Sequence, residues 1–331
     1  MANIAKVQLI TDAGEDLAAR LDPRLVALRL SEKRGGEADE LQIDIQNHDG
    51  AMAMPTPGRE LVLSIGWAEG GREVPVGLVG KGRFKVDEVE MGGPPDMIAI
   101  RARSADLSGD LRKRRTKSWR DTTLGALLGE IAARHGRSLG IAPDLSASPI
   151  KAIEQEGKSD MQFVRDLGSR YDAIATWKDT ALLFLPIGSA VTASGLAIPG
   201  LVLRKRDGWT WRFTQAEREK YDGAEAQYHD PDAGRRKTVK TEGENRRKLK
   251  RVYASEDEAR QAAESAQKKA ARMPWSFTYD LAIADPAIQP DQKVTLQGWN
   301  STIDGIEWLI ESIETTFDGS GLVQSLTLES A

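Results

Sequence analysis

Residues 158–188, KSDMQFVRDLGSRYDAIATWKDTALLFLPIG, change their hydrophobic period halfway and show how the chain is built. Ser159 and Gln162 have the spacing of a capping box, which predicts that a helix begins here. Apolar side chains then recur at helical spacing up to Tyr171. After it the period falls to two, which predicts a short strand, a turn at Asp179-Thr180 and a second, apolar strand. The stretch therefore indicates a compact helix–hairpin unit, although an ordinary α+β core piece has the same pattern.

The flanking segments divide the chain into three predicted domains. Residues 106–188 contain a basic connector, an amphipathic helix and the helix–hairpin unit, and are predicted to form a small α+β domain. Residues 1–105 and 189–331 alternate polar and apolar positions between frequent turns, which predicts two antiparallel β-barrel or sandwich domains. An Ala-rich helix at 257–272 is expected to pack on a sheet. The predicted fold class is mainly β with an α+β insertion.

The two strand-rich segments resemble each other in the order of their apolar residues. Pro57 and Pro290 are each followed, at the same offsets, by two apolar residues of a predicted strand. An aromatic strand that begins at Phe84 matches one that begins at Trp308, position for position in character. Alternating strands also resemble each other by chance, so duplication and coincidence both stay open at this point.

Composition restricts the classes of function. The 331 residues are 40% hydrophobic and 29% charged, which is typical of globular domains. No apolar run approaches the roughly 20 residues of a membrane span, so no membrane anchor is expected. The chain has no cysteine, which excludes disulfides and thiolate metal sites and suits assembly in a reducing cytoplasm. A net charge of −4 does not favour a dedicated nucleic-acid binder.

Candidate catalytic residues are scarce. His48, His135 and His229 are far apart, have Asp or Arg nearby as surface histidines often do, and show no metal-ligand spacing. The glycine-rich stretch 77–82 precedes a predicted strand and not a helix, which argues against a phosphate loop. No Gly-x-Ser-x-Gly motif is present. The sequence therefore predicts no catalytic, metal or cofactor site, and a protein that is not an enzyme.

Two runs of cations are the candidate contact sites. One lies in the connector at 112–117 and the other in a polar arm at 235–251. An acidic partner or nucleic-acid phosphates would fit such runs, and a solvated connector and arm would have the same composition. No helix-turn-helix or stacking-aromatic pattern accompanies them, so specific nucleic-acid binding is not expected. The candidate partner-contact residues are Arg235, Arg236, Lys237, Arg246, Arg247 and Lys248.

Stretches along nearly the whole chain resemble the late control gene D protein family of tailed phages. They are residues 82–90 with Pro94-Pro95, 102–106, Trp119 with Thr123-Leu124, 159–164 with Leu167 and 171–173, 257–272 with Pro290, and 308–330. That family is similar in fold to the central baseplate hub of T-even phages. It is also similar to the hub part of the valine-glycine-repeat spike proteins of type VI secretion.

The resemblance implies a structural protein of a phage tail or of a headless tailocin. Hubs of this kind are homotrimers, and each chain has two tail-tube-like β-domains with a small α/β domain between them. Such a hub adapts a hexameric tail tube to a trimeric spike and contacts other baseplate proteins. The expected location is the virion tail baseplate, after assembly in the host bacterial cytoplasm. A spike-associated cell-wall hydrolase and a nucleic-acid-binding protein are the alternative functions.

Overall fold

The protein divides into two compact units in its computed structural model. Unit 1 comprises Met1–Ala105, Gly200–Phe213 and Phe277–Leu328. Unit 2 comprises Asp106–Pro199, Thr214–Ser276 and Glu329–Ala331. The structure describes residues 2–17, 21–35, 38–52, 54–104, 110–177, 181–191, 197–215, 221–231, 233–272 and 275–331.

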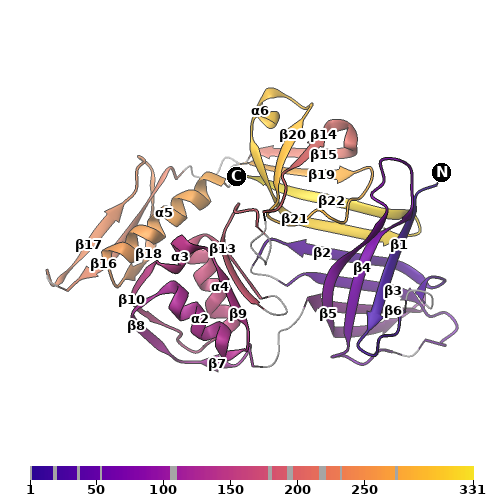
Figure 1. Ribbon diagram of the computed structural model, residues 1–331, viewed down its shortest axis with the longest axis horizontal. Coiled ribbons are helices and arrows are strands. Elements are labelled where there is room, and N and C mark those ends of the chain that lie inside the picture. Colours follow the sequence, from indigo (N-terminus) through magenta and orange to yellow (C-terminus); the bar gives the residue numbers. More distant parts are fainter. Residues whose placement is uncertain are drawn as a thin grey trace. The chain divides into compact units, whose positions relative to one another are not determined.

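Unit 1 is built on one large, curled sheet (Figure 1). Its first strands are β1 (Ile4–Thr11), β2 (Leu25–Lys33), β3 (Glu40–Gln46), β4 (Glu60–Glu69), β5 (Gly77–Gly92) and β6 (Met97–Ser104). Its later strands are β14 (Leu201–Arg204), β15 (Gly208–Gln215), β19 (Trp275–Leu281), β20 (Lys293–Gln297), β21 (Glu307–Asp318) and β22 (Gly321–Ser330). Two short helical segments, η1 (Lys205–Asp207) and α6 (Ser301–Asp304), lie between the later strands.

The strand order is β1-β4-β5-β6-β3-β2-β21-β22-β19-β15, and β20 pairs with both β14 and β21. The period-two pattern of the sequence appears here as alternating burial. In β3, for example, Leu41, Ile43 and Ile45 are buried while their neighbours are partly exposed. The buried side chains of the first half of the sheet form one apolar core, which also includes Ala284 and Leu322 of the second half. The prediction of a mainly β fold with an α+β part is confirmed.

Two sets of five strands have the same arrangement within this sheet. The order β4-β5-β6-β3-β2 in the first half corresponds to β20-β21-β22-β19-β15 in the second, and the order along the chain also agrees. Gly58 and Asp291, which directly follow the two prolines, both have a positive φ, 94° and 65°. Their N–H groups donate to the carbonyl oxygens of Val86 and Ile310, which are matching positions of the aromatic strands. The resemblance therefore includes topology and turn geometry, which supports duplication over chance.

The two strand sets are joined edge to edge inside the chain. Strand β2 pairs antiparallel with β21, in a regular register from Ala27 opposite Asp318 to Lys33 opposite Ser312 (Figure 1). The Ser31 hydroxyl donates to Glu314 Oε1 at 2.5 Å across this junction. Both sets consequently belong to one continuous sheet.

Unit 2 contains the predicted helix–hairpin unit. It consists of α4 (Asp160–Tyr171), β12 (Ala173–Trp177) and β13 (Ala181–Pro186). Ser159 is the N-cap of α4 and accepts from the N–H of Gln162 at 3.2 Å, which is the N-cap half of the predicted capping box, while the Gln162 side-chain amide donates to Asp166 Oδ1 at 2.7 Å. The predicted turn at Asp179-Thr180 lies outside the described residues.

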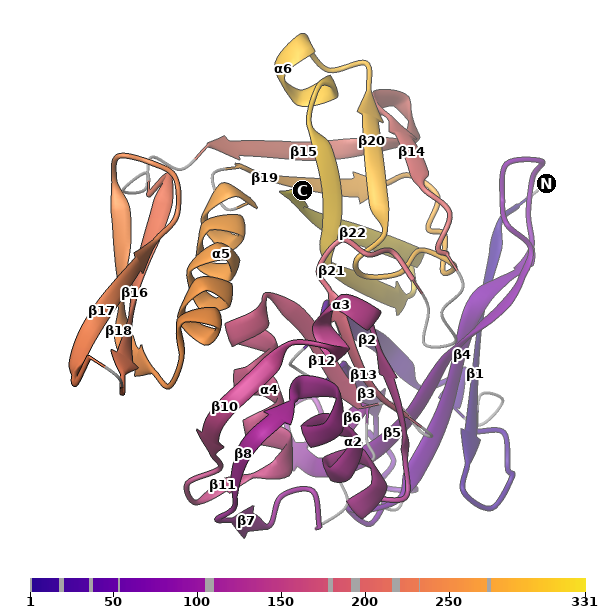
Figure 2. The ribbon, with the colours of Figure 1, turned by 60° about the vertical axis from the view of Figure 1, so that its left-hand side comes forward.

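Several neighbouring elements complete this α+β part of unit 2 (Figure 2). The helix α2 (Leu124–Arg134) and α4 pack their apolar faces into one core, in which Trp119 stacks on Phe163 with ring centroids 5.4 Å apart. Strand β9 (Ser138–Ile141) adds to β13 in parallel. The remaining elements are β7 (Arg114–Arg115), β8 (Ser118–Thr123), α3 (Pro143–Ser146), β10 (Pro149–Glu154) and β11 (Lys158–Ser159).

A helix-covered sheet forms the rest of unit 2. Its strands are β16 (Gly223–Asp230), β17 (Arg235–Lys240) and β18 (Arg246–Tyr253), in the order β17-β16-β18. The helix predicted at 257–272 is α5 (Glu256–Arg272). It lies along the sheet (Figure 2), and its small residues Ala259 and Ala263 are buried in the core that it shares with Ala224 and Ala226.

The division into domains 1–105, 106–188 and 189–331 stays a prediction. In the structure, Thr214–Ser276 of the third segment belongs to unit 2 and not to the sheet of unit 1. The physical reason is α5, which packs against β16 and also contacts α4 and β10. Period-two strands at 224–253 look the same in a sequence whichever sheet they join.

Candidate functional site

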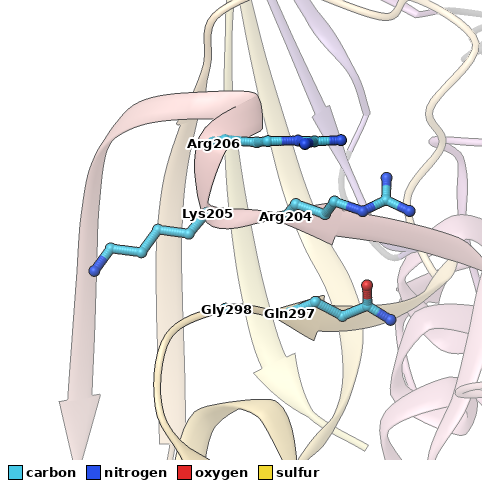
Figure 3. A pocket seen from close by; sticks show the side chains of 5 residues that line it. All are labelled: Arg204, Lys205, Arg206, Gln297 and Gly298. Atoms are coloured by element: carbon cyan, nitrogen blue, oxygen red, sulfur yellow. The ribbon is translucent and has the colours of Figure 1, made fainter.

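A cleft of about 340 Å³ in unit 1 is lined by cationic side chains (Figure 3). The Lys205 side chain points away from those of Arg204 and Gln297, so the polar groups do not converge on one point. The Lys205 ammonium lies over the ring of Trp211, 5.4 Å from its centroid. Among the described residues that line the cleft, none has a carboxylate or an imidazole. The lining residues are Arg204, Lys205, Arg206, Gln297 and Gly298.

A buried ion cluster surrounds Asp160, the first residue of α4. Its fully buried carboxylate accepts from Arg134 Nη1 at 2.8 and 2.9 Å and from Gln155 Nε2 at 2.7 Å. Nε2 of His135 lies 2.8 Å from Asp160 Oδ2. The interpretation of His135 as a surface histidine is wrong, because its side chain is only 4% exposed.

The charged form of the Asp160 carboxylate is stabilised by its hydrogen bonds. Burial alone would raise the pKa of Asp160, but hydrogen bonds from Gln155, His135 and Arg134 outweigh burial and lower that pKa. A carboxylate with a lowered pKa and no solvent access is a poor general base. The cluster therefore fixes the start of α4 against the end of α2.

A second buried carboxylate, Glu258 of α5, connects the Ala-rich helix to the α+β part of unit 2. Its side chain is 1% exposed and accepts from the N–H of Lys151 at 2.8 Å and of Ala152 at 3.4 Å. It also accepts from Arg170 Nη2 at 2.7 Å. The guanidinium of Arg170 lies over the Tyr253 ring, 4.9 Å from its centroid. One carboxylate thus holds α5, β10 and α4 together.

The basic arm is the three-stranded sheet β17-β16-β18, and its cations lie on two faces. Helix α5 covers the face that contains Ala224. Side chains alternate along a strand, so Glu225 points to the face opposite α5. Lys240 and Lys248 both pair with Glu225 and lie on that opposite face. Arg236 and Arg246, which pair with His229 and Gly223, lie there too.

The other candidate cations lie on the α5 side of this sheet. On β16, the side chains of Ala224, Tyr228 and Asp230 lie on the face that α5 covers. Their partners on the neighbouring strands are Arg247, Lys237 and Arg235, respectively. The Lys237 ammonium forms an ion pair with Asp230 Oδ2 at 2.5 Å. The structure therefore separates the six candidates into two groups of three. It adds Lys240, which the sequence analysis missed because the signal is a strand register and not a run of cations.

Strand β15 of unit 1 is an exposed edge with aromatic side chains. It stands at the end of the strand order among the described residues. Trp209 is 66% exposed, and Trp211 is 40% exposed although its ring stacks on Phe277 with centroids 6.0 Å apart. On β5, Met91 is also 50% exposed. Uncovered strand edges with exposed apolar side chains are typical of interaction surfaces.

The described residues contain no group of three or more His, Asp or Glu residues that could hold a metal ion. In the same part of the chain, no helix is both long and apolar enough to cross a membrane. The expected absence of catalytic, metal and cofactor sites stays a prediction.

Comparison with known proteins identifies relatives over nearly the full length. No family model matches the chain. It is 31% identical over 369 residues to the "Probable baseplate hub protein" of Escherichia phage 186, covering 99% of this chain and 93% of that protein. It is 33% identical over 355 residues to the protein of the same name in Escherichia phage P2, covering 95% and 90%.

Solved structures show the same fold. The tail protein from Neisseria meningitidis MC58 matches with a TM-score of 0.68 at 11% identity, covering 99% of this chain and 96% of that one. The E. coli c3393 protein, a component of the type VI secretion system, matches with a TM-score of 0.56 at 12% identity, covering 99% and 76%. The fold is therefore that of phage tail and type VI secretion proteins.

Sequence identity is more specific than this fold class. The chain belongs to the family of the baseplate hub proteins of phages 186 and P2. The resemblance to phage hubs and to type VI secretion spike proteins is confirmed, and the structural hub role agrees with it.

Proposed function

We propose that the protein is a homotrimeric hub that adapts a hexameric tail tube to a trimeric spike in a phage tail or tailocin. The duplicated strand set of unit 1 carries the proposal. Three chains would present six similar β-units to a sixfold tube, and the chains themselves would match a threefold spike. The hub would contact other baseplate proteins in the virion tail after assembly in the host bacterial cytoplasm.

Threefold symmetry at the tail tip is the expected result for purified tails. Cryo-electron microscopy of tails with and without this chain would locate it, since deletion of its gene should remove the density between tube and spike. A complementing copy of the gene serves as the control. Density with another symmetry, or tails of normal structure without the chain, would contradict the hub.

The absence of enzymatic activity belongs to the same proposal. The described residues of the cationic cleft include no acid–base pair, and the buried carboxylates of Asp160 and Glu258 are bound by donors. The purified protein should leave no clearing in a peptidoglycan zymogram in which lysozyme does. Clearing that a single point substitution abolishes would favour the cell-wall hydrolase.

The face of the arm opposite α5 is proposed as a contact for an acidic baseplate partner. Replacing Arg236 and Lys248 by Glu should impair tail assembly while leaving the isolated chain folded. Each exposed pair contributes only about 0.2–1 kcal/mol, so loss requires several reversed charges. The matched control replaces Arg235 and Arg247, on the α5 side of the same strands.

Infectious titre and circular dichroism measure the two effects of these arm variants. Equal titres of both double variants and the wild type would support a solvated arm. Salt-dependent retention of duplex DNA in a gel shift, lost only in the variant of the opposite face, would favour the nucleic-acid alternative.

A further inference from the structure

We propose that β15 of one copy pairs antiparallel with residues 87–92 of β5 in a second copy of the chain. The register is that of the internal β2–β21 junction. This inference rests on the proposed trimeric hub, and it specifies which two strand edges join the copies.

At the internal junction, the core-facing side chains of both paired strands are buried. Leu28 and Leu30 of β2 are 1% and 0% exposed, with β21 paired along their strand. On the β21 side, Ile313 and Thr315 are 0% and 1% exposed. Both strands of the junction are therefore fully packed.

The matching strand of the second set, β15, has the same place as β2, but no strand of the described residues covers its outer edge. Strand β15 is the neighbour of β19, as β2 is the neighbour of β3, and β19 and β3 are matching strands. Trp211 stacks on Phe277 of β19, while Leu30 lies opposite Leu41 of β3. Aligning Trp211 with Leu30 on this basis brings Trp209 to the place of Leu28, and Trp209 and Trp211 are 66% and 40% exposed. The exposure of these aromatics is explained by a missing neighbour.

The matching edge on the first set lies along the end of β5. Strand β4 pairs with β5 only as far as Lys85, and the turn at 58–59 binds the backbone of Val86. Among the described residues, β5 then pairs only with β6 up to Gly92. The corresponding part of β21 is where β2 binds. Met91, which matches the buried Thr315, is 50% exposed.

Transferring the internal register to these two edges gives three chemically matched pairs. Trp211 comes opposite Met91, and sulfur–aromatic contacts of this kind are favourable. Phe213 comes opposite Val89, an aromatic–β-branched pair. Arg212 comes opposite Glu90, at the place where Ser31 donates to Glu314 in the internal junction. The register follows from aligning Trp211 with Leu30 and Met91 with Thr315, and the charge complementarity of Arg212 and Glu90 was not used in that alignment.

A second copy also accounts for the exposed edges themselves. An open strand edge with two exposed tryptophans invites uncontrolled pairing. These two edges belong to different strands, so the contact is heterologous and repeats head to tail. A closed ring of such contacts covers every β15 edge and the end of every β5.

Engineered disulfides test the register directly, because the chain has no cysteine of its own. Glu90→Cys with Arg212→Cys should yield covalently linked copies on a non-reducing gel after oxidation. Both side chains are exposed, so neither substitution removes a core contact. Ser31→Cys with Glu314→Cys is the positive control, since these residues are opposite within one chain.

The negative control places the second cysteine one strand further away. Arg101 lies on β6 opposite Glu88, so it would be two strand spacings, about 10 Å, from β15. That separation is too long for a disulfide. Arg101→Cys with Arg212→Cys should therefore stay monomeric under the same oxidation.

The outcomes distinguish this junction from the hub function. If only the variant with Glu90→Cys and Arg212→Cys gives covalently linked copies, the junction is supported. No linked copies, when the internal control pair oxidises, overturns the junction even if the chain is found in threefold tail tips. Equal linking by the Arg101 and Glu90 pairs overturns it too, because random collision then explains the product.

Charge reversal gives a second readout without cysteine. Arg212→Glu and Glu90→Arg should each weaken self-association, by about fivefold per reversed contact. The double variant restores the opposite charges and should recover association. Analytical ultracentrifugation of the three variants measures this, and a double variant weaker than both single variants would contradict the pairing.

Discussion

Replacing Glu258 by Ala is expected to lower the free energy of unfolding by about 3–5 kcal/mol, the usual cost of breaking a buried ion pair. The side chain of Arg170 is 8% exposed and would lose its carboxylate partner. The N–H of Lys151 would lose its acceptor at 2.8 Å. Both groups would then be left desolvated without compensation.

Urea unfolding followed by circular dichroism measures the effect of this substitution. Glu264→Ala is the matched control, since Glu264 lies on the exposed face of the same helix. It should change the free energy by less than about 0.5 kcal/mol. Similar losses for both variants would show that α5 is not anchored through Glu258.

Replacing Asp160 by Asn should destabilise the protein by a similar amount, about 3–5 kcal/mol at neutral pH. The amide keeps the shape of the side chain but removes the charge that Arg134 contacts at 2.8 and 2.9 Å. It also places an NH2 group among donors, so at least one donor loses its acceptor.

The pH dependence of this effect has a definite sign. The folded pKa of Asp160 is lowered, so its stabilisation is present in full above the unfolded pKa of about 3.9. It is lost as the pH falls through the lowered folded value. The difference between wild type and variant should therefore be constant near neutral pH and shrink in strong acid. A difference that grows in acid would contradict this assignment.

The exposed Asp144 provides the control for the pH series. Asp144→Asn should have little effect on stability at any pH, because no buried cation depends on it. If both aspartate variants gave the same pH profile, the buried cluster would not be its cause.

Local features of the fold could be predicted from the sequence. The capping box at Ser159 and the apolar spacing up to Tyr171 act within one helix, so they determine α4 without knowledge of the rest. The aromatic strands at Phe84 and Trp308 were predicted for the same reason. The matched order of their neighbours left duplication and coincidence open, and the sheet order then supports duplication.

Long-range features could not be predicted. The pairing of Ser31 with Glu314 depends on where two distant strands meet, and alternation contains no information on the partner. His135 seemed a surface residue because its partner Asp160 is brought to it by the packing of α4. The two faces of the arm depend on a register with β16 that a run of cations does not reveal.

The β2–β21 junction also affects folding during translation, because its two strands are far apart in the sequence. Ser31 leaves the ribosome 283 residues before Glu314. At a translation rate of about 5–20 residues per second, β21 is synthesised about 15 to 60 seconds after β2. The outer edge of β2 therefore stays uncovered until β21 has been synthesised, and closing so long a loop makes this step slow. During this interval, β2 is open to pairing with strands of other chains.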